Sequence, residues 1–157
     1  MIAVYPGSFD PITNGHVDII KRCARIYDKI YVAVLNNISK NTLFSISERI
    51  EMIKKSINIP NIEICSFSGI LIDFAESVGA KIIIRGIRSL IDFEYEFQYS
   101  INNKILNPNI ETILLTARPE FFHISSSVVK ELSFFKKNVS NMVPNEVAIR
   151  LTEKYLK

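Results

Sequence analysis

The chain has 157 residues, a length typical of one domain whose core needs no disulfide or metal to hold it together. Hydrophobic residues make up 48% and charged residues 22% of it, which excludes a disordered chain, and five Gly and six Pro exclude collagen-like or low-complexity sequence. The net charge is only +3, with no run of more than two like charges, which favours small anionic ligands over a nucleic-acid partner.

The apolar segments of the chain predict a cytoplasmic protein with no membrane partner. The first apolar run, residues 2–5, ends at Pro6 and Gly7, far short of the core of a signal peptide. No stretch approaches the ~18 apolar residues that a membrane span needs. Cys23 and Cys65 lie in apolar stretches at no metal-binding spacing, so we expect free, buried thiols in a reducing compartment.

Short runs of β-branched and apolar residues predict five strands. The runs cover residues 2–5, 30–35, 62–65, 81–85 and 111–115. Several are apolar throughout, which is typical of strands covered on both faces of a parallel sheet. The segments between them are long enough for crossover helices.

Those intervening segments carry helix signals. Apolar residues recur at helical spacing, and capping residues mark helix starts. The positions are Val17, Ile20, Ala24 and Tyr27, then Ser45 with Glu48, then Ser125, and finally Pro144 in the first turn of a C-terminal helix. The alternation predicts an α/β fold: a single Rossmann-like domain over residues 1–157, with a doubly wound five-stranded parallel sheet and helices on both faces.

The segment from residue 91 to residue 101 is ambiguous. Apolar residues occupy every odd position, a period of two that favours a strand. Leu90, Phe93 and Phe97 nevertheless lie on one helical face that continues to Leu106, which is long for a strand. We therefore predict a helix. An aromatic-rich helix that one subunit cannot fully bury suggests a subunit interface.

The loop after the first predicted strand, residues 6–16, has the composition of a phosphate site. Gly7 permits close backbone approach, Ser8 offers a hydroxyl, and His16 lies at a helix start, where free amides attract anions. The alternative is a turn with an incidental histidine. Neither a Gly-x-Gly-x-x-Gly fingerprint nor a Walker A loop occurs, which argues against a classical dehydrogenase or a P-loop protein.

Two arginines lie at the end of the fourth predicted strand and flank Gly86. Arg85 comes directly after the apolar run 82–84, and Arg88 lies beyond Gly86. A charge that directly follows a buried strand needs a partner, which favours an anion site over surface decoration.

Several stretches resemble those of the nucleotidyltransferase superfamily. The string of residues 6–16 is similar to its first signature, and the form Thr13-Asn14-Gly15-His16 resembles that of the phosphopantetheine adenylyltransferases. Cytidylyltransferases and nicotinamide-nucleotide adenylyltransferases usually carry His at the position of Thr13. Further agreement in order and spacing is found at residues 39–40, 84–88, 92–96 and 124–127 with Lys130. The resemblance covers nearly the whole chain.

The resemblance implies transfer of AMP from ATP to 4′-phosphopantetheine, giving 3′-dephospho-coenzyme A and pyrophosphate in coenzyme A biosynthesis. The nucleophile is itself a phosphate, so direct in-line attack needs no strong base and no covalent enzyme intermediate. Mg²⁺ is expected with ATP; we name no protein ligand, since it is held largely through substrate phosphates. The resemblance also implies a homohexamer.

By the same resemblance, His16 would stabilise the transition state at the α-phosphate, and Lys40 would hold the phosphopantetheine phosphate and align its attack. The catalytic residues are then His16, Lys40 and Arg88. The ATP-binding residues are Ser8, Phe9, His16, Gly86, Ile87, Arg88, Glu96, Phe121, Phe122, His123, Ile124, Ser125, Ser126 and Ser127. The acceptor-binding residues are Ser8, Lys40, Leu71 and Arg85.

Some of these positions have plainer interpretations when the resemblance is set aside. Lys40 and Glu96 would be solvated charges, Leu71 a core residue, and the serines at 125–127 a helix cap. Two other functions also stay open. One is a nucleotidyltransferase with another acceptor, such as a cytidylyl or nicotinamide-mononucleotide enzyme; the other is a non-catalytic nucleotide-binding module on the same fold.

Overall fold

The computed structural model describes residues 1–36 and 41–156, in which strands and helices alternate as predicted. The strands are β1 (Ile2–Gly7), β2 (Lys29–Leu35), β3 (Ile62–Phe67), β4 (Ile82–Ile87) and β5 (Glu111–Thr116). The helices are α1 (Asn14–Cys23), α2 (Ile46–Ser56), α3 (Leu71–Ser77), α4 (Leu90–Leu106), α5 (Ser126–Phe134) and α6 (Asn145–Tyr155), with a 3₁₀ turn at Pro119–Phe121. Among these described residues, no helix is both long enough and apolar enough to cross a bilayer.

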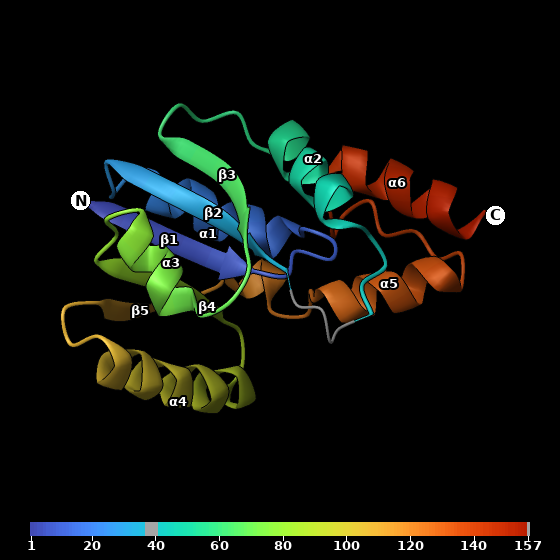
Figure 1. The fold of residues 1–157 in the computed structure, drawn as a ribbon. Helices are drawn as coiled ribbons and strands as arrows, with labels where there is room; N and C mark the ends of the chain where they lie inside the picture. Colours follow the sequence, from blue (N-terminus) through green and yellow to red (C-terminus); the bar gives the residue numbers. More distant parts are fainter. Residues whose placement is uncertain (37–40, 157) are drawn as a thin grey trace.

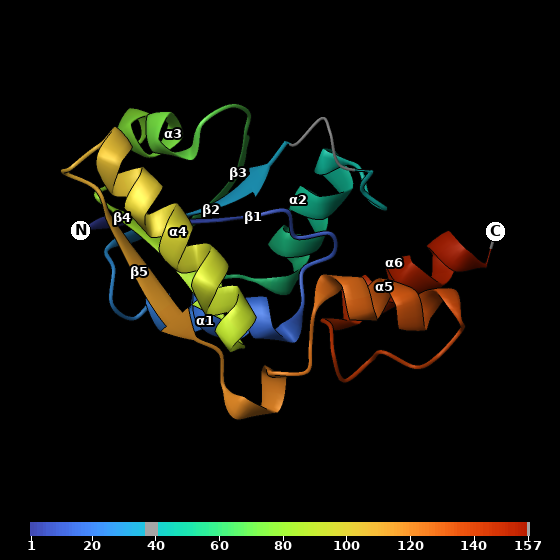
Figure 2. The ribbon, with the colours of Figure 1, turned by 90° about the horizontal axis from the view of Figure 1, so that it is seen from below.

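All five strands are parallel and lie in the order β3-β2-β1-β4-β5 (Figures 1 and 2). Successive side chains of a strand point to opposite faces of the sheet. Ala3 and Tyr5 therefore pack into one core with residues of α1, α2, α5 and α6. Val4 and Ile83 pack into a second core with residues of α3. Helices thus cover both faces, which confirms the predicted doubly wound sheet.

Local capping explains where several helices begin. Ser45 and Glu48 form the predicted capping box, with the Ser45 N–H donating to Glu48 Oε2 at 2.7 Å. Ser125 caps α5 by accepting from the Val128 N–H at 3.1 Å. Pro144 is the N-cap of α6 and not a residue of its first turn, so this helix begins slightly later than predicted.

The ambiguous segment is helical, as the longer apolar period indicated. Ser89 caps α4 by accepting from the Asp92 N–H at 3.1 Å, and the helix continues to Leu106. The two cysteines are free thiols; Cys23 is buried, but Cys65 is only half-buried.

The sheet opens between β1 and β4, where the strand order reverses. These two strands pair only through Ala3 with Ile82 and Val4 with Ile83, whereas β1 and β2 pair along their whole length. The strands therefore separate towards their carboxyl ends, which is the place where doubly wound sheets bind ligands. In Figure 1, α5 and α6 lie beyond this edge of the sheet, so the loops that follow β1 and β4 and the start of α5 meet there.

Candidate active site

His16 lies in the first turn of α1 in a defined tautomer. The Thr13 N–H donates to His16 Nδ1 at 3.0 Å, and the His16 N–H donates to Thr13 Oγ1 at 3.4 Å, so the pair forms a capping box with His at its third position. Because Nδ1 accepts a hydrogen bond from the backbone, the proton of a neutral ring resides on Nε2. His16 therefore offers an N–H donor to the space in front of α1.

The environment of His16 keeps its ring neutral. Burial, followed by the positive charges of Arg88 and Arg85, lowers its pKa to about 4. The ring of Phe9 packs edge-on against it, with 5.2 Å between the ring centroids. At neutral pH the histidine can thus donate a hydrogen bond to a phosphate oxygen without carrying a charge of its own.

Arg85, at the carboxyl end of β4, is fixed by a two-pronged ion pair with Glu96 of α4. Its Nε and Nη2 each donate to one carboxylate oxygen at 2.6 Å, and Nη1 donates to the Pro6 carbonyl at 3.3 Å. Paired hydrogen bonds of this kind fix both position and plane of a guanidinium. Glu96, predicted as an ATP ligand, is thus also the partner of an arginine predicted to bind the acceptor.

Arg88 is held in a similar way by the first turn of α4 and by the loop before α5. Its Nε and Nη2 donate to the carboxylate of Asp92 at 3.0 and 3.3 Å, and Nη1 donates to the Ile124 carbonyl at 2.7 Å. A guanidinium has five N–H donors, so one hydrogen on each terminal nitrogen remains for a ligand. Arg88 is therefore oriented but still able to bind an anion.

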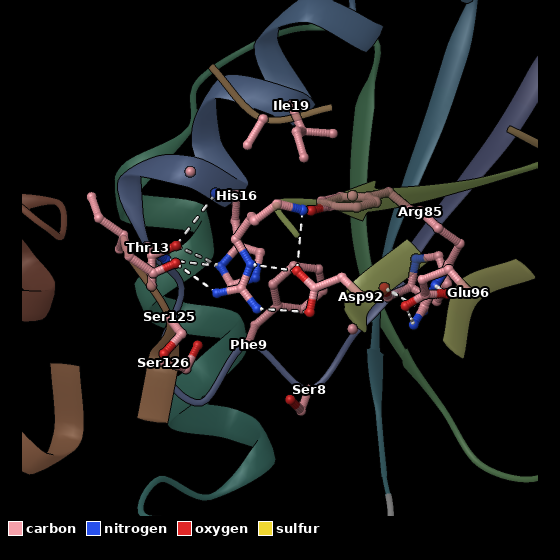
Figure 3. Close-up of a pocket in the computed structure, with 18 of the residues that line it drawn as sticks. Ser8, Phe9, Thr13, His16, Ile19, Arg85, Asp92, Glu96, Ser125 and Ser126 are labelled. Atoms are coloured by element: carbon pink, nitrogen blue, oxygen red, sulfur yellow. Dashed lines mark hydrogen bonds and ion pairs between the residues drawn. The ribbon is translucent and has the colours of Figure 1, made fainter. Parts of the chain in front are cut away.

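These side chains surround a cavity of about 300 Å³. Figure 3 draws His16 with Thr13, Ser125 and Ser126 on one side, and Arg85 with Glu96 on the other. The predicted site residues among its lining are Ser8, Phe9, His16, Arg85, Gly86, Arg88, Glu96, Ile124, Ser125, Ser126 and Ser127. The amino ends of α1 and α5 both meet this cavity, and free amides with the positive end of the helix dipole favour anions there.

Four predicted ATP-binding residues do not line this cavity: Ile87, Phe121, Phe122 and His123. Along β4 successive side chains alternate between faces, so Ile87 does not share the orientation of Gly86. After the 3₁₀ turn, Phe122 and His123 are exposed, and the chain turns inward only at the buried Ile124.

A second cavity, of about 550 Å³, adjoins the first. Ser8 and Arg85 line both cavities, and Leu71 of α3 lines the second. Its other walls include the apolar side chains of Leu35 and Phe67. The structure thus gathers around one cavity three of the four residues predicted to bind the acceptor. The fourth, Lys40, lies outside the described residues.

Buried polar contacts hold the loop between β1 and α1 in place. Asp10 accepts from the Leu43 and Phe44 N–H groups at 3.0 and 2.9 Å and from Lys130 Nζ at 2.8 Å. Ser126 Oγ donates to the Pro11 carbonyl at 2.8 Å. These contacts tie the loop to the segment before α2 and to α5, so the cavity has walls from distant parts of the sequence.

Sequence reasoning assigned no role to Thr13 or Asp92, which fix the orientation of His16 and Arg88. A signal for each exists in the spacing. Thr13 precedes His16 by three residues, as in a capping box, and Asp92 follows Arg88 by four, as in a helical ion pair. The carboxylates of Asp92 and Glu96 are both engaged by arginines, and within the described ranges no three His, Cys, Asp or Glu residues are grouped to hold a metal ion.

Together these features define a doubly wound α/β protein with a cavity at the switch point of its sheet, lined by arginines and by the amino ends of two helices. A family model described as cytidylyltransferase-like matches residues 4–132. A solved structure provisionally described as a nicotinate-nucleotide adenylyltransferase, from Vibrio parahaemolyticus, superposes with a TM-score of 0.68 over 99% of this chain and 91% of that one. At 14% identity this likeness supports the fold alone.

Curated relatives narrow the class. The phosphopantetheine adenylyltransferase of Caldanaerobacter subterraneus subsp. tengcongensis is 52% identical over 99% of this chain and 98% of the relative. Those of Dictyoglomus thermophilum and Alkaliphilus metalliredigens are 52% and 47% identical over 98% of this chain, covering 94% and 98% of the relatives. The chain therefore belongs to the phosphopantetheine adenylyltransferase family of nucleotidyltransferases.

Proposed function

We propose that this enzyme transfers the adenylyl group of ATP to 4′-phosphopantetheine, releasing pyrophosphate and forming 3′-dephospho-coenzyme A. The observation that carries the proposal is the pair of adjoining cavities. The first offers His16 and Arg88 as donors for a triphosphate. The second has both apolar and polar walls and is large enough for an extended pantetheine arm. Ser8 and Arg85 lie at their junction, where the acceptor phosphate would meet the α-phosphoryl group.

In this reaction a phosphate oxygen of the acceptor attacks the α-phosphorus, and the bond from that phosphorus to the bridging oxygen of pyrophosphate breaks. The protein positions the two anions and stabilises the charge on the transferring group. The Nε2–H of His16 and the two free N–H groups of Arg88 are among the donors that could reach the α-phosphoryl oxygens. Because they are held before substrate arrives, they need little reorganisation during the reaction.

Mg²⁺ would enter with ATP. Asp92 and Glu96 both hold arginines, so the described residues that line the cavity offer this ion no free pair of carboxylates. The phosphates of the nucleotide and water would be its ligands. A bound Mg²⁺ would neutralise part of the charge of the triphosphate. The chain's own contribution is the orientation of His16, Arg85 and Arg88.

We further propose that the enzyme is a homo-oligomer that functions in the cytoplasm, where ATP is abundant. Large apolar side chains of α4 are exposed in the single chain, among them Leu90 at 82%, Ile105 at 72% and Tyr95 at 65%. A surface of this kind on a helix that also carries Asp92 and Glu96 favours contact with a second copy.

Pyrophosphate release by the purified protein tests the reaction. We expect release from ATP and Mg²⁺ only when 4′-phosphopantetheine is present, with 3′-dephospho-coenzyme A as the second product. Nicotinamide mononucleotide offered with ATP, and phosphocholine offered with CTP, serve as the matched alternatives. Release with either of them and not with phosphopantetheine would assign another acceptor, and ATP binding without any release would indicate a non-catalytic module.

A further inference from the structure

A buried arginine contacts the loop that follows β1, which contributes to both cavities. Arg49 of α2 is only 3% exposed, and no carboxylate lies within ion-pair distance of it in residues 1–36 and 41–156. Its guanidinium donates instead to main-chain carbonyls: Nη1 to Ser8 at 2.7 Å and to Leu35 at 3.4 Å, and Nε to Ser45 at 3.4 Å. Burial lowers the pKa of Arg49, and the negative charge of Asp10, which lies beyond ion-pair distance, offsets this only in part. Burying a cation whose hydrogen-bond partners are neutral is unfavourable, so a role beyond packing is expected.

The shortest of these bonds fixes a peptide group of the active site. The Ser8 carbonyl belongs to the Ser8–Phe9 peptide, and in a trans peptide the C=O and N–H point in opposite directions. With the carbonyl turned towards Arg49, the Phe9 N–H points away from α2. Ser8 and Phe9 line the cavity, whereas Arg49 does not. No acceptor for this N–H is found in the described part of the chain.

The backbone of Phe9 is strained in a way that makes such a hold necessary. Its φ of 46° lies in the left-handed region, which a non-glycine residue rarely adopts. In this conformation the Phe9 ring folds back over Gly7, where an added Cβ would come within 2.9 Å of Phe9 Cζ. A conformation of this kind persists only where the surroundings impose it. Arg49 holds the carbonyl of the preceding residue, Ser8, and the following residue, Asp10, is held by its own buried hydrogen bonds. Phe9 is therefore constrained from both sides.

We propose that Arg49 is a positioning residue: by holding the Ser8 carbonyl it aims the Phe9 N–H into the cavity as a fixed donor for a phosphoryl oxygen of the nucleotide. Arg49 touches neither substrate and acts only through this peptide. A backbone amide fixed in advance adds to the donors of His16 and Arg88 without adding charge. The inference rests on the proposed function for the identity of the ligand as ATP.

Arg49→Met is the variant that tests this, because methionine keeps a long apolar stem and removes every donor. The Ser8 and Leu35 carbonyls lose their donor in this variant, so we expect a lower melting temperature with the fold retained. We expect kcat to fall at least tenfold, with a smaller change in the KM for phosphopantetheine. Arg49→Lys keeps the charge and a donor, and we expect it to recover part of kcat. Arg150→Met is the control. Arg150 donates to Glu51 of α2, the helix that carries Arg49, but it makes no contact with the loop between β1 and α1.

The second measurement follows the Phe9 amide itself by NMR on protein labelled with ¹⁵N-phenylalanine. We expect a large shift of the Phe9 amide when MgATP binds to the wild type, and its loss in Arg49→Met at saturating MgATP. An unchanged kcat in the folded Arg49→Met variant, or an unchanged amide shift, would overturn the proposal. If Arg49→Met does not fold, Arg49→Lys with the wild-type kcat and amide shift would do the same. The amide measurement uses MgATP alone and no phosphopantetheine. It therefore tests the role of Arg49 even if the wild type fails to use phosphopantetheine as a substrate.

Discussion

The imidazole of His16 serves the fold and the proposed reaction through different nitrogen atoms. Nδ1 accepts from the Thr13 N–H and completes the cap of α1, while Nε2 presents its proton to the cavity. The capping bond selects the tautomer that a phosphate site needs. A substitution can therefore remove one contribution and keep the other, which makes this residue suitable for separating stability from turnover.

Substituting His16 by Asn and by Ala should separate these two contributions. Asn places its Oδ1 near the position of Nδ1 and can keep the bond to Thr13, whereas Ala leaves that N–H without its acceptor. We expect both variants to lose roughly 10²–10³-fold in kcat with little change in the Kd for ATP, since the missing donor acts mainly in the transition state. Only Ala should also lower the free energy of unfolding, by about 1 kcal/mol. Equal losses in kcat and ATP affinity would contradict this role.

The ionisation of His16 can be followed directly, because the chain has only two histidines. With a pKa of about 4, lowered from 6.5, the ring should stay neutral when the pH falls from 8 to 5.5. We expect its Cε1–H NMR signal, assigned with His16→Asn, to stay constant over this range, and its midpoint to rise when MgATP adds negative charge nearby. A midpoint near 6.5 in the free enzyme would refute the assignment.

The lowered pKa of His16 also makes the free energy of unfolding depend on pH. Between pH 4 and 6.5 the unfolded chain binds a proton at His16 that the folded chain does not. The contribution of this group therefore lowers the free energy of unfolding as the pH falls through that window. Urea denaturation of the wild type and of His16→Asn at pH 7 and pH 5 measures it, and we expect the wild type to lose more stability between the two pH values than the variant does. Equal losses would show that the ring ionises alike in both states.

At the scale of elements, the first turn of α4 aims Arg88. Asp92 accepts from the Arg88 backbone N–H at 3.1 Å and from its guanidinium, so the helix start and the side chain share one carboxylate. Asp92→Asn keeps an acceptor for the backbone but weakens the hold on the guanidinium. We expect kcat to fall about tenfold because Arg88 loses its alignment. The KM for ATP should not rise, because the variant is more positive. A raised KM with an unchanged kcat would instead mean that Asp92 serves ATP binding alone.

The elements that the sequence predicted well are those fixed by local pattern. Continuous apolar runs identified the strands, and Ser125 was identified as the cap of its helix from its place before an apolar pattern. For α4 the two periods conflicted, and the deciding feature was length, because a strand of that extent is rare. Patterns of this kind depend on neighbours in sequence, so one chain is enough to detect them.

Contacts between distant residues were harder to predict. Nothing local indicates that Arg49 meets the Ser8 carbonyl, or that Glu96 pairs with Arg85, because tertiary packing brings each pair together. The segment 121–123 shows a limit of prediction from a motif. Resemblance grouped it with Ile124 as one ATP-binding stretch, but the 3₁₀ turn leaves Phe122 and His123 exposed. A motif gives the order of residues and not the direction of each side chain.

At the scale of the whole molecule, α4 links the candidate active site to the outer surface. Asp92 and Glu96 on it hold the two cavity arginines, while apolar side chains such as Phe97, Ile101 and Ile105 are exposed. Figure 2 shows α4 as a long helix crossing the side of β4 and β5, away from α5 and α6. A partner copy that covers this face would also limit the movement of the helix that positions both arginines.

Charge placed on that face tests the assembly. For the wild type we expect a mass of several times 17.9 kDa by light scattering, and for the double variant Ile101→Glu with Ile105→Glu a shift towards the single-chain mass, because four or more like charges would be buried where copies meet. Ile26→Glu is the matched control, since Ile26 is 68% exposed and lies in the turn after α1, outside α4. If α4 contacts steady the arginines, dissociation should also lower kcat at dilute protein, and higher protein concentration should restore it by mass action. A wild type that is monomeric at micromolar concentration, or a double variant that keeps its full assembly mass, would remove α4 as the interface.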